Sequence, residues 1–184
     1  MNQARIYQVD KTKCHLKRTH SIVREMWRDN KTAGALDLGT VLLIVAVEPP
    51  VKHKESVTVF SELRTNYHKG TILSIAATVS FSFKKRDGVF SRLDHKEALV
   101  KFMNMTGLGV AEDKSEIKSR PKATFLGPIK EKASGNLISI GNAFSIAGQM
   151  EVTDENLLAN ALTNGIGGRK SYGFGLILIG SEDE

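Results

Sequence analysis

The chain has 184 residues, of which 41% are hydrophobic and 25% charged, a composition typical of a globular protein that excludes a largely disordered one. Its single cysteine, Cys14, permits no internal disulfide and no cysteine-based zinc cluster, and no apolar run approaches the ~20 residues that span a bilayer. The net charge of +6 favours an acidic partner such as RNA, DNA or anionic lipid, and the predicted setting is the cytoplasm, without a signal peptide.

The first half of the chain alternates strand-like and helix-like segments. An apolar face of helical period predicts a helix over residues 19–30, and residues 62–67 are a short helix or a turn. Alternating or β-branched runs predict strands over residues 4–9, 40–47, 56–60 and 71–83. This order of elements, β-α-β-β-(α)-β, is that of a ferredoxin-like unit.

The same order then begins again. A helix is predicted over residues 94–105 with Gly107 as its stop, and a short helix after a cap at Thr153 or Asp154. Extended segments are predicted over residues 110–124, 137–140, 144–152 and 176–179. The sequence therefore predicts an α+β protein of two tandem ferredoxin-like domains with antiparallel sheets. Their predicted ranges are residues 1–76 and 77–184, with one long strand at the boundary that can serve both.

A glycine-rich loop joins the last predicted helix to the last predicted strand. Five glycines fall between Gly165 and Gly175, around Arg169, Lys170 and Tyr172, and such bare backbone can approach a polyanion closely. Dinucleotide fingerprints and Walker A loops lead from a strand into a helix, so the reversed direction here excludes both. One interpretation is a turn whose glycines only allow close packing. The interleaved cations and aromatic ring favour nucleic-acid binding.

Three segments resemble one known family. The run Gly-Ile-Gly-Gly-Arg-Lys-Ser-Tyr-Gly-Phe-Gly-Leu-Ile-Leu-Ile, from Gly165, resembles the glycine loop of CRISPR-associated repeat-processing endoribonucleases of the RAMP superfamily, particularly the CasE type found in type I-E Cascade. Thr-Asp-Glu-Asn-Leu-Leu-Ala-Asn-Ala-Leu, from Thr153, is similar to the family's helix before that loop. Ile-Lys-Ser-Arg-Pro, from Ile117, is similar to its basic segment before a hairpin. The resemblance covers most of the chain and implies a tandem RAMP/RRM-like fold.

The resemblance also implies one catalytic histidine near the first helix. Thr-His-Ser-Ile-Val-Arg-Glu-Met-Trp, from residue 19, is similar to the family's histidine-containing first helix, so His20 is the predicted catalyst. By residue pattern alone His20 ranks only slightly above His15, because a lone histidine is more often a surface or capping residue. His53, His68 and His95 are predicted to have solvated structural roles.

The chemistry implied by the family is metal-independent RNA cleavage, in which a 2′-hydroxyl attacks the adjacent phosphorus and imidazole transfers protons. Arg24 and Lys31 share the side of the helix with His20 and are predicted to stabilise phosphate charge. Some relatives carry a tyrosine one turn before the histidine, where this chain reads Leu-Lys-Arg. The second catalytic group therefore stays open between Lys17, Arg24 and Lys31, with Tyr172 as a stacking or hydrogen-bonding partner of a nucleotide. No acidic pair has two-metal spacing, and no metal or cofactor is predicted.

RNA contacts are predicted for basic side chains and for the glycine loop, because phosphates dominate the recognition of A-form RNA. In the family, such a basic segment contacts the stem of a repeat hairpin. Each lysine patch has an alternative as a merely solvated edge. The predicted contacts are Lys84, Lys85, Arg86, Lys118, Arg120, Lys122, Lys130, Lys132, Gly165, Gly167, Gly168, Arg169, Lys170 and Tyr172.

The predicted function is cleavage of precursor CRISPR RNA at the 3′ base of the repeat stem-loop. The product is retained in a Cascade-like complex, with other Cascade subunits, the backbone subunit in particular, as partners and no membrane. The alternative is a non-catalytic RNA-binding subunit of the same architecture, in which His20 only contacts RNA. A nucleotide-binding regulator that uses the glycine loop is disfavoured by the direction of that loop.

Overall fold

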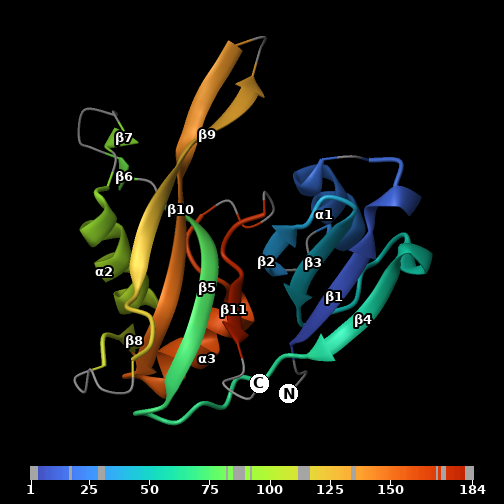
Figure 1. Ribbon diagram of the computed structural model, residues 1–184. Coiled ribbons are helices and arrows are strands. Elements are labelled where there is room, and N and C mark those ends of the chain that lie inside the picture. The colour runs from blue at the N-terminus through green and yellow to red at the C-terminus, as the bar shows by residue number, and fades with distance from the viewer. Residues whose placement is uncertain are drawn as a thin grey trace.

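The computed structural model of the chain describes residues 4–16, 18–28, 32–81, 83–84, 90–91, 93–111, 117–133, 136–168, 170 and 173–180. Figure 1 shows two antiparallel sheets side by side, with the β9–β10 hairpin extending beyond the rest of the second unit. Among the described residues, no helix is long and apolar enough to cross a membrane.

The first sheet has the strand order β2-β3-β1-β4, and all of its neighbouring strands are antiparallel. Its elements are β1 (Arg5–Asp10), η1 (Lys11–Lys13), α1 (Thr19–Trp27), β2 (Thr32–Asp37), β3 (Val41–Ala46), η2 (Lys54–Ser56) and β4 (Val57–Glu62). Because β3 is inserted between β1 and β2, the unit β1-α1-β2 is a split βαβ, as in a ferredoxin-like domain. The short turn η2 stands where the second helix of that domain would be.

Strand β3 is apolar along its whole length because both of its faces are covered. Leu42 and Ile44 belong to the core beneath α1, together with Trp27. Val45 is buried in the other core, against the second unit, and Leu43 packs beside it. Successive side chains of a strand point to opposite faces, so the first sheet is enclosed between α1 and the second unit.

The second sheet repeats the arrangement, with the strand order β11-β5-β10 and with β9 and β8 both paired to β10. Its elements are β5 (Ile72–Phe81), α2 (His95–Thr106), β8 (Leu108–Gly109), β9 (Lys122–Ala133), β10 (Asn136–Val152), α3 (Glu155–Asn164) and β11 (Ile177–Gly180). A further short pair, β6 (Phe83–Lys84) with β7 (Phe90–Ser91), precedes α2. Strand β10 lies between β5 and β9, so this is again a split βαβ. The predicted α+β fold of two tandem ferredoxin-like units is confirmed.

The helix boundaries follow local capping signals. Asp94 and Glu97 form a reciprocal capping box at the start of α2, and Gly107 ends the helix with a φ of 64°. Asp154 caps α3 by accepting hydrogen bonds from the amides of Asn156 and Leu157. The predicted stop at Gly107 and the predicted cap at Asp154 are confirmed.

The structure differs from the predicted elements at several places. Strand β2 was not expected, because its sequence Thr-Ala-Gly-Ala-Leu-Asp is rich in residues that are rare in strands. The two segments predicted over residues 137–140 and 144–152 are parts of the single strand β10. Residues 63–68 form neither a helix nor a turn. Strand β5 pairs with β10 and β11, and the predicted boundary between residues 76 and 77 falls inside it.

Candidate functional site

The predicted catalytic histidine lies in the first turn of α1, and an aspartate fixes this turn to the first sheet. Asp37, at the end of β2, accepts hydrogen bonds from the Thr19 hydroxyl, from Lys11 Nζ at 2.7 Å and from the Gly39 amide at 3.0 Å. Burial raises the pKa of Asp37, but the hydrogen bonds from Lys11, Thr19 and Gly39 outweigh it and hold that pKa below its usual value. The carboxylate is therefore ionised near neutral pH, where negative charge favours a helix N-terminus.

His20 stands at one rim of the apolar face of α1 and is half-buried. In a helical projection it lies about 20° from the buried Trp27 and about 40° from Arg24, which is exposed. Lys17 and Lys31 lie outside the described residues. Of the three predicted catalytic residues, the structure thus describes two, and it brings them to one side of the helix.

The glycine loop of the second unit contacts the start of this helix. A Cβ atom built on Gly173 would lie 3.9 Å from Cγ2 of Thr19. Gly34, in β2, lies closer to the end of the loop, because its Cβ would stand 2.6 Å from the amide nitrogen of Leu176. Since Thr19 immediately precedes His20, the helix turn that carries the histidine and the glycine loop meet in one place, although they are about 150 residues apart in the sequence.

Backbone hydrogen bonds hold the loop over the end of β5. The amide of Gly168 donates to the carbonyl of Ser80 at 3.0 Å, and the amide of Gly175 donates to the carbonyl of Thr78 at 2.8 Å. A further bond at 3.2 Å, from the Ile166 amide to the Gly175 carbonyl, closes the loop on itself. The loop is therefore a fixed part of the second unit at the described residues.

Lys170 supports the loop from within. Its Nζ donates a hydrogen bond of 2.5 Å to the carbonyl of Asn164, the last residue of α3. Burial lowers the pKa of the Lys170 ammonium. A cation at this position satisfies a terminal carbonyl and interacts favourably with the C-terminal end of the helix. Its role as an RNA contact stays a prediction. Arg169 and Tyr172 lie outside the described residues.

Packing explains most of the loop's glycines. Four of the five have positive φ angles, which leaves Gly168 as the exception. At Gly167, for example, φ is 70° and a Cβ would stand 2.6 Å from the carbonyl oxygen of Ser80. Gly168 has neither constraint, because a Cβ there would have no atom of the described residues within 4 Å. The described residues therefore leave open space beside the backbone of Gly168, and its role as an RNA contact stays a prediction.

The predicted basic contacts form a separate strip along β9 and the segment before it. Lys118, Arg120, Lys122 and Lys130 are all exposed. The Gln149 side-chain oxygen fixes the start of the strip by accepting hydrogen bonds from the amides of Lys118, at 2.5 Å, and Ser119, at 3.1 Å. Three strand spacings, about 14 Å, separate β9 from β11 in the sheet. The strip therefore lies away from His20.

Some predicted contacts cannot be placed, and some important residues were not predicted. The structure describes the backbone but not the side chains of Lys84 and Lys132, while Lys85 and Arg86 lie outside the described residues. Among the residues that sequence reasoning missed are Asp37, Gly34 and Gln149. A glycine inside a strand often signals a close backbone approach, and this was the available clue for Gly34. Nothing in the local sequence identifies Asp37 or Gln149, because their partners are distant in the chain.

Comparison with known proteins gives one family and several similar structures. The family model described as CRISPR associated protein matches residues 78–180, more than half of the chain. No curated protein matches. A structure of CRISPR endoribonuclease Cse3 bound to 19 nt RNA is 15% identical, with a TM-score of 0.71 over 97% of this chain and 100% of that chain.

Two further structures are similar over nearly the whole chain. Thermus thermophilus Cse3 bound to an RNA representing a pre-cleavage complex is 15% identical, with a TM-score of 0.68 over 97% of this chain and 100% of that chain. The CRISPR-associated protein Cas6e from Escherichia coli str. K-12 is 13% identical, with a TM-score of 0.58 over 96% of this chain and 97% of that chain. At these identities the likeness establishes the fold.

Proposed function

The chain belongs to the CRISPR-associated protein family, and from this premise we propose that it is an endoribonuclease that cleaves precursor CRISPR RNA without a metal, at the 3′ base of the repeat stem-loop. The observation that carries the proposal is the proximity of the first turn of α1 to the glycine loop, where a Cβ built on Gly173 would lie 3.9 Å from Cγ2 of Thr19. The helix turn that carries His20 thereby lies beside the glycine loop. The similar Cse3 structures contain RNA, which agrees with the proposal.

His20 is the proton-transfer group. An imidazole nitrogen can accept or donate a proton, so His20 can serve as base or acid. It removes the proton of a ribose 2′-hydroxyl, or it protonates the departing 5′-oxygen. The 2′-oxygen forms a bond to the adjacent phosphorus while the bond from phosphorus to the 5′-oxygen breaks. The products are a 2′,3′-cyclic phosphate and a 5′-hydroxyl.

Arg24 supplies positive charge next to the reacting phosphate. It follows His20 by one helical turn and is exposed, so its guanidinium can reach a phosphate held over the same side of α1. Fixed positive charge that faces the developing phosphorane stabilises the transition state more than the ground state. Lys17 and Lys31 stay candidates for the same role, and Tyr172 stays a candidate for stacking on a nucleotide.

RNA binding is divided between the glycine loop and the basic strip of β9. The open backbone at Gly168 allows a phosphate to approach closely, and Lys118, Arg120, Lys122 and Lys130 offer cations to the phosphates of a stem. An A-form duplex is recognised through its shape and its phosphates, and separated patches suit such a rod. In this proposal the cleaved RNA stays bound, and the protein joins the other subunits of a Cascade-like complex in the cytoplasm, the backbone subunit in particular.

The test is cleavage of the host's repeat RNA by the purified protein in EDTA, under single-turnover conditions. Wild-type protein should yield the cyclic phosphate and 5′-hydroxyl ends, and a 2′-deoxy substitution at the cut site should block cleavage but not binding. His20→Ala should lower the cleavage rate by about 10²–10⁴-fold and leave RNA affinity nearly unchanged. The control is His68→Ala, since His68 is 90% exposed in its side chain and faces Glu155 in the second unit.

A non-catalytic RNA-binding subunit is the second candidate, and one sequence feature favours it. The tyrosine that some relatives carry one turn before their histidine is absent here, where the chain reads Leu-Lys-Arg. This candidate predicts that wild-type protein binds the repeat RNA tightly and leaves it intact. If the RNA stays intact in the EDTA assay and again with added Mg²⁺, the protein is a binding subunit and not an endoribonuclease.

A further inference from the structure

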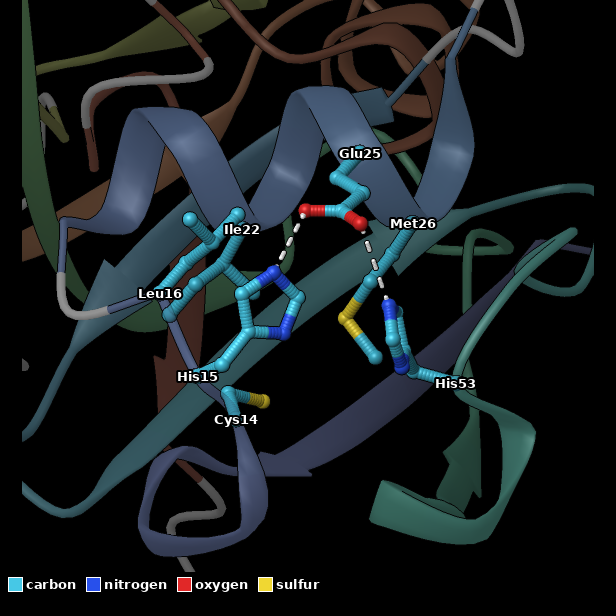
Figure 2. Close-up of a pocket in the computed structure, with 7 residues that line it drawn as sticks. All are labelled: Cys14, His15, Leu16, Ile22, Glu25, Met26 and His53. Carbon is cyan, nitrogen blue, oxygen red and sulfur yellow. Dashed lines mark hydrogen bonds and ion pairs between the residues drawn. The ribbon is translucent and has the colours of Figure 1, made fainter.

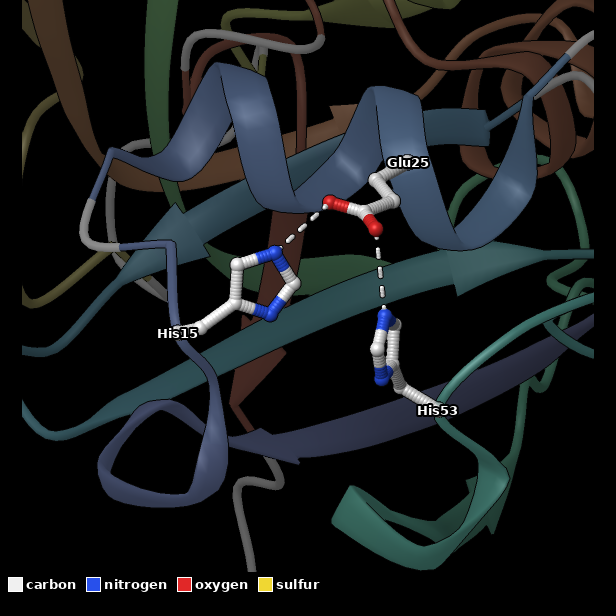
Figure 3. A group of neighbouring side chains, drawn as sticks. All are labelled: His15, Glu25 and His53. Atoms are coloured by element: carbon white, nitrogen blue, oxygen red, sulfur yellow. Dashed lines mark hydrogen bonds and ion pairs between the residues drawn. The ribbon is translucent and has the colours of Figure 1, made fainter.

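Two histidines and a glutamate converge at a pocket beside α1 (Figure 2). His15 Nε2 lies 3.5 Å from Glu25 Oε2, and His53 Nε2 lies 3.2 Å from Glu25 Oε1. The two imidazole rings are 5.4 Å apart between centroids. Figure 3 shows one carboxylate shared by both rings. One potential ligand atom from each residue lies within 4.8 Å of the other two.

Three separate segments supply these groups. His15 follows η1, Glu25 belongs to α1, and His53 lies in the connection between β3 and β4. The amides of Val51 and Lys52 both donate to the carbonyl of Met26, so the connection is docked on the end of α1. The group is therefore held by backbone contacts and not only by its own side chains.

The backbone of His53 is in an uncommon conformation. Its φ of 55° and ψ of 40° lie in the left-handed region of the backbone, which residues other than glycine rarely occupy. In that conformation its imidazole points to Glu25 (Figure 3). An uncommon backbone conformation that directs a side chain into a cluster of potential ligands is a feature of functional sites.

We propose that His15, Glu25 and His53 bind a zinc ion, with water in the fourth position. Two imidazole nitrogens and one carboxylate oxygen are a ligand set that Zn²⁺ accepts, whereas Mg²⁺ and Ca²⁺ prefer oxygen alone. Bonds of 2.0–2.1 Å place neighbouring ligands of a tetrahedral zinc about 3.3 Å apart. The two histidine–glutamate distances, 3.2 and 3.5 Å, are close to this value, but each goes to a different oxygen of Glu25, so the carboxylate must turn to present one oxygen to the ion.

The ligand atoms must also move closer together. The nearest ligand atoms lie within 4.8 Å, so a movement of about 1.5 Å completes the tetrahedral geometry. The His15 side chain is 63% exposed and can rotate without disturbing the core. His53 and Glu25, at 33% and 27%, are more enclosed and form the fixed part of the site.

The zinc site is separate from the proposed cleavage site. Glu25 follows His20 by five positions, which places the two about 140° apart around α1, at the two rims of its apolar face. The metal thus has no part in RNA cleavage, and the expected activity in EDTA still holds. Instead, it joins the segment before α1, the helix itself and the segment before β4, and so stabilises the unit that carries His20.

The experiment measures zinc binding without RNA, so its outcome is independent of the proposed function. Metal-free protein is titrated with Zn²⁺ by calorimetry and melted with and without the ion. A concentration of about 100 times the Kd should raise Tm by about 5–11 °C, while Mg²⁺ should not change it. His15→Ala, His53→Ala and Glu25→Gln should each weaken zinc binding at least tenfold, whereas the control His68→Ala should keep the wild-type Kd and shift.

Three results would overturn the proposal: no zinc-dependent rise in Tm, an equal rise in the double variant His15→Ala/His53→Ala, or an equal loss of binding in His68→Ala. In these cases Glu25 only makes ion pairs with two surface imidazoles. If His53→Ala fails to fold, the exposed His15 keeps the test decisive, because its removal leaves the core intact. At a temperature where the metal-free protein is fully folded, loss of RNA cleavage in EDTA would count against the proposed function and not against the zinc site.

Discussion

Replacing Gly34 by alanine tests whether the contact between the two units sets the geometry of cleavage. The added Cβ would stand 2.6 Å from the amide nitrogen of Leu176 and 2.9 Å from the carbonyl carbon of Gly175. Carbon atoms in contact prefer 3.5–4.0 Å, so one backbone must move by roughly 1 Å. Both neighbours are main chain, and Gly175 is bonded to the carbonyl of Thr78, so no flexible side chain can absorb the movement.

Two effects of this movement can be estimated. Overpacking of this kind costs about 1–3 kcal/mol, which lowers Tm by about 2–12 °C for a chain of this length. A displacement of about 1 Å between groups that must cooperate can lower a catalytic rate about 100-fold. Gly34→Ala should therefore lower the single-turnover cleavage rate by about 10–100-fold at saturating protein, at a temperature where the variant is fully folded.

The matched control is Gly39→Ala, in the turn that connects β2 to β3. A Cβ at Gly39 meets no atom within 4 Å, but its φ of 85° is unfavourable for alanine. This variant should lose about 1 kcal/mol of stability and keep the wild-type cleavage rate. The reasoning fails if Gly34→Ala cleaves at the wild-type rate, or if both variants lose activity in proportion to their lost stability.

Three further changes test the supports of the site. Asp37→Asn should lower the free energy of unfolding by about 1 kcal/mol at pH 7, because the charged bonds to Lys11 are lost. The pKa of Asp37 is lowered in the folded protein, so the difference between wild type and variant should persist above about pH 4 and vanish as pH falls through that folded pKa. Urea unfolding at several pH values measures this difference. Lys170→Met removes the bond to Asn164 and should lower Tm by about 1–6 °C in a melting experiment. Trp27→Phe shrinks a fully buried side chain and removes its 3.0 Å hydrogen bond to the Glu48 carbonyl, which should cost about 2–4 kcal/mol in urea unfolding; an unchanged midpoint would contradict the assigned contact.

Periodicity predicted most of the fold because it records burial. The apolar side of α1, the apolar run of β3 and the alternation of β5 each correspond to faces that are covered in the structure. Strand β2 was not predicted because its residues have low strand propensity and its pairing with β3 holds it in an extended conformation. Propensity is a local quantity, and the decisive hydrogen bonds of β2 are made to another strand.

The candidate site was predictable only in part. Resemblance to the family led to His20 and to the glycine loop, but no pattern in the sequence shows that Thr19 and Gly173 meet. The grouping of His15, Glu25 and His53 was also beyond the sequence, because a loop 38 residues after His15 returns to the same helix. The sequence favoured solvated structural roles for His53, and it weighed His15 only as an alternative to His20.

The position of α1 depends on contacts from outside the helix. At nine residues it is shorter than the roughly 12–15 that give an isolated helix even marginal stability, so tertiary contacts must hold it. Asp37 holds its first turn, and the connection before β4 docks on its last turn through the Met26 carbonyl. Zinc at Glu25 would add a third support on the rim opposite His20. A helix held in this way keeps its first turn, and with it the backbone of His20, in a fixed position beside the glycine loop.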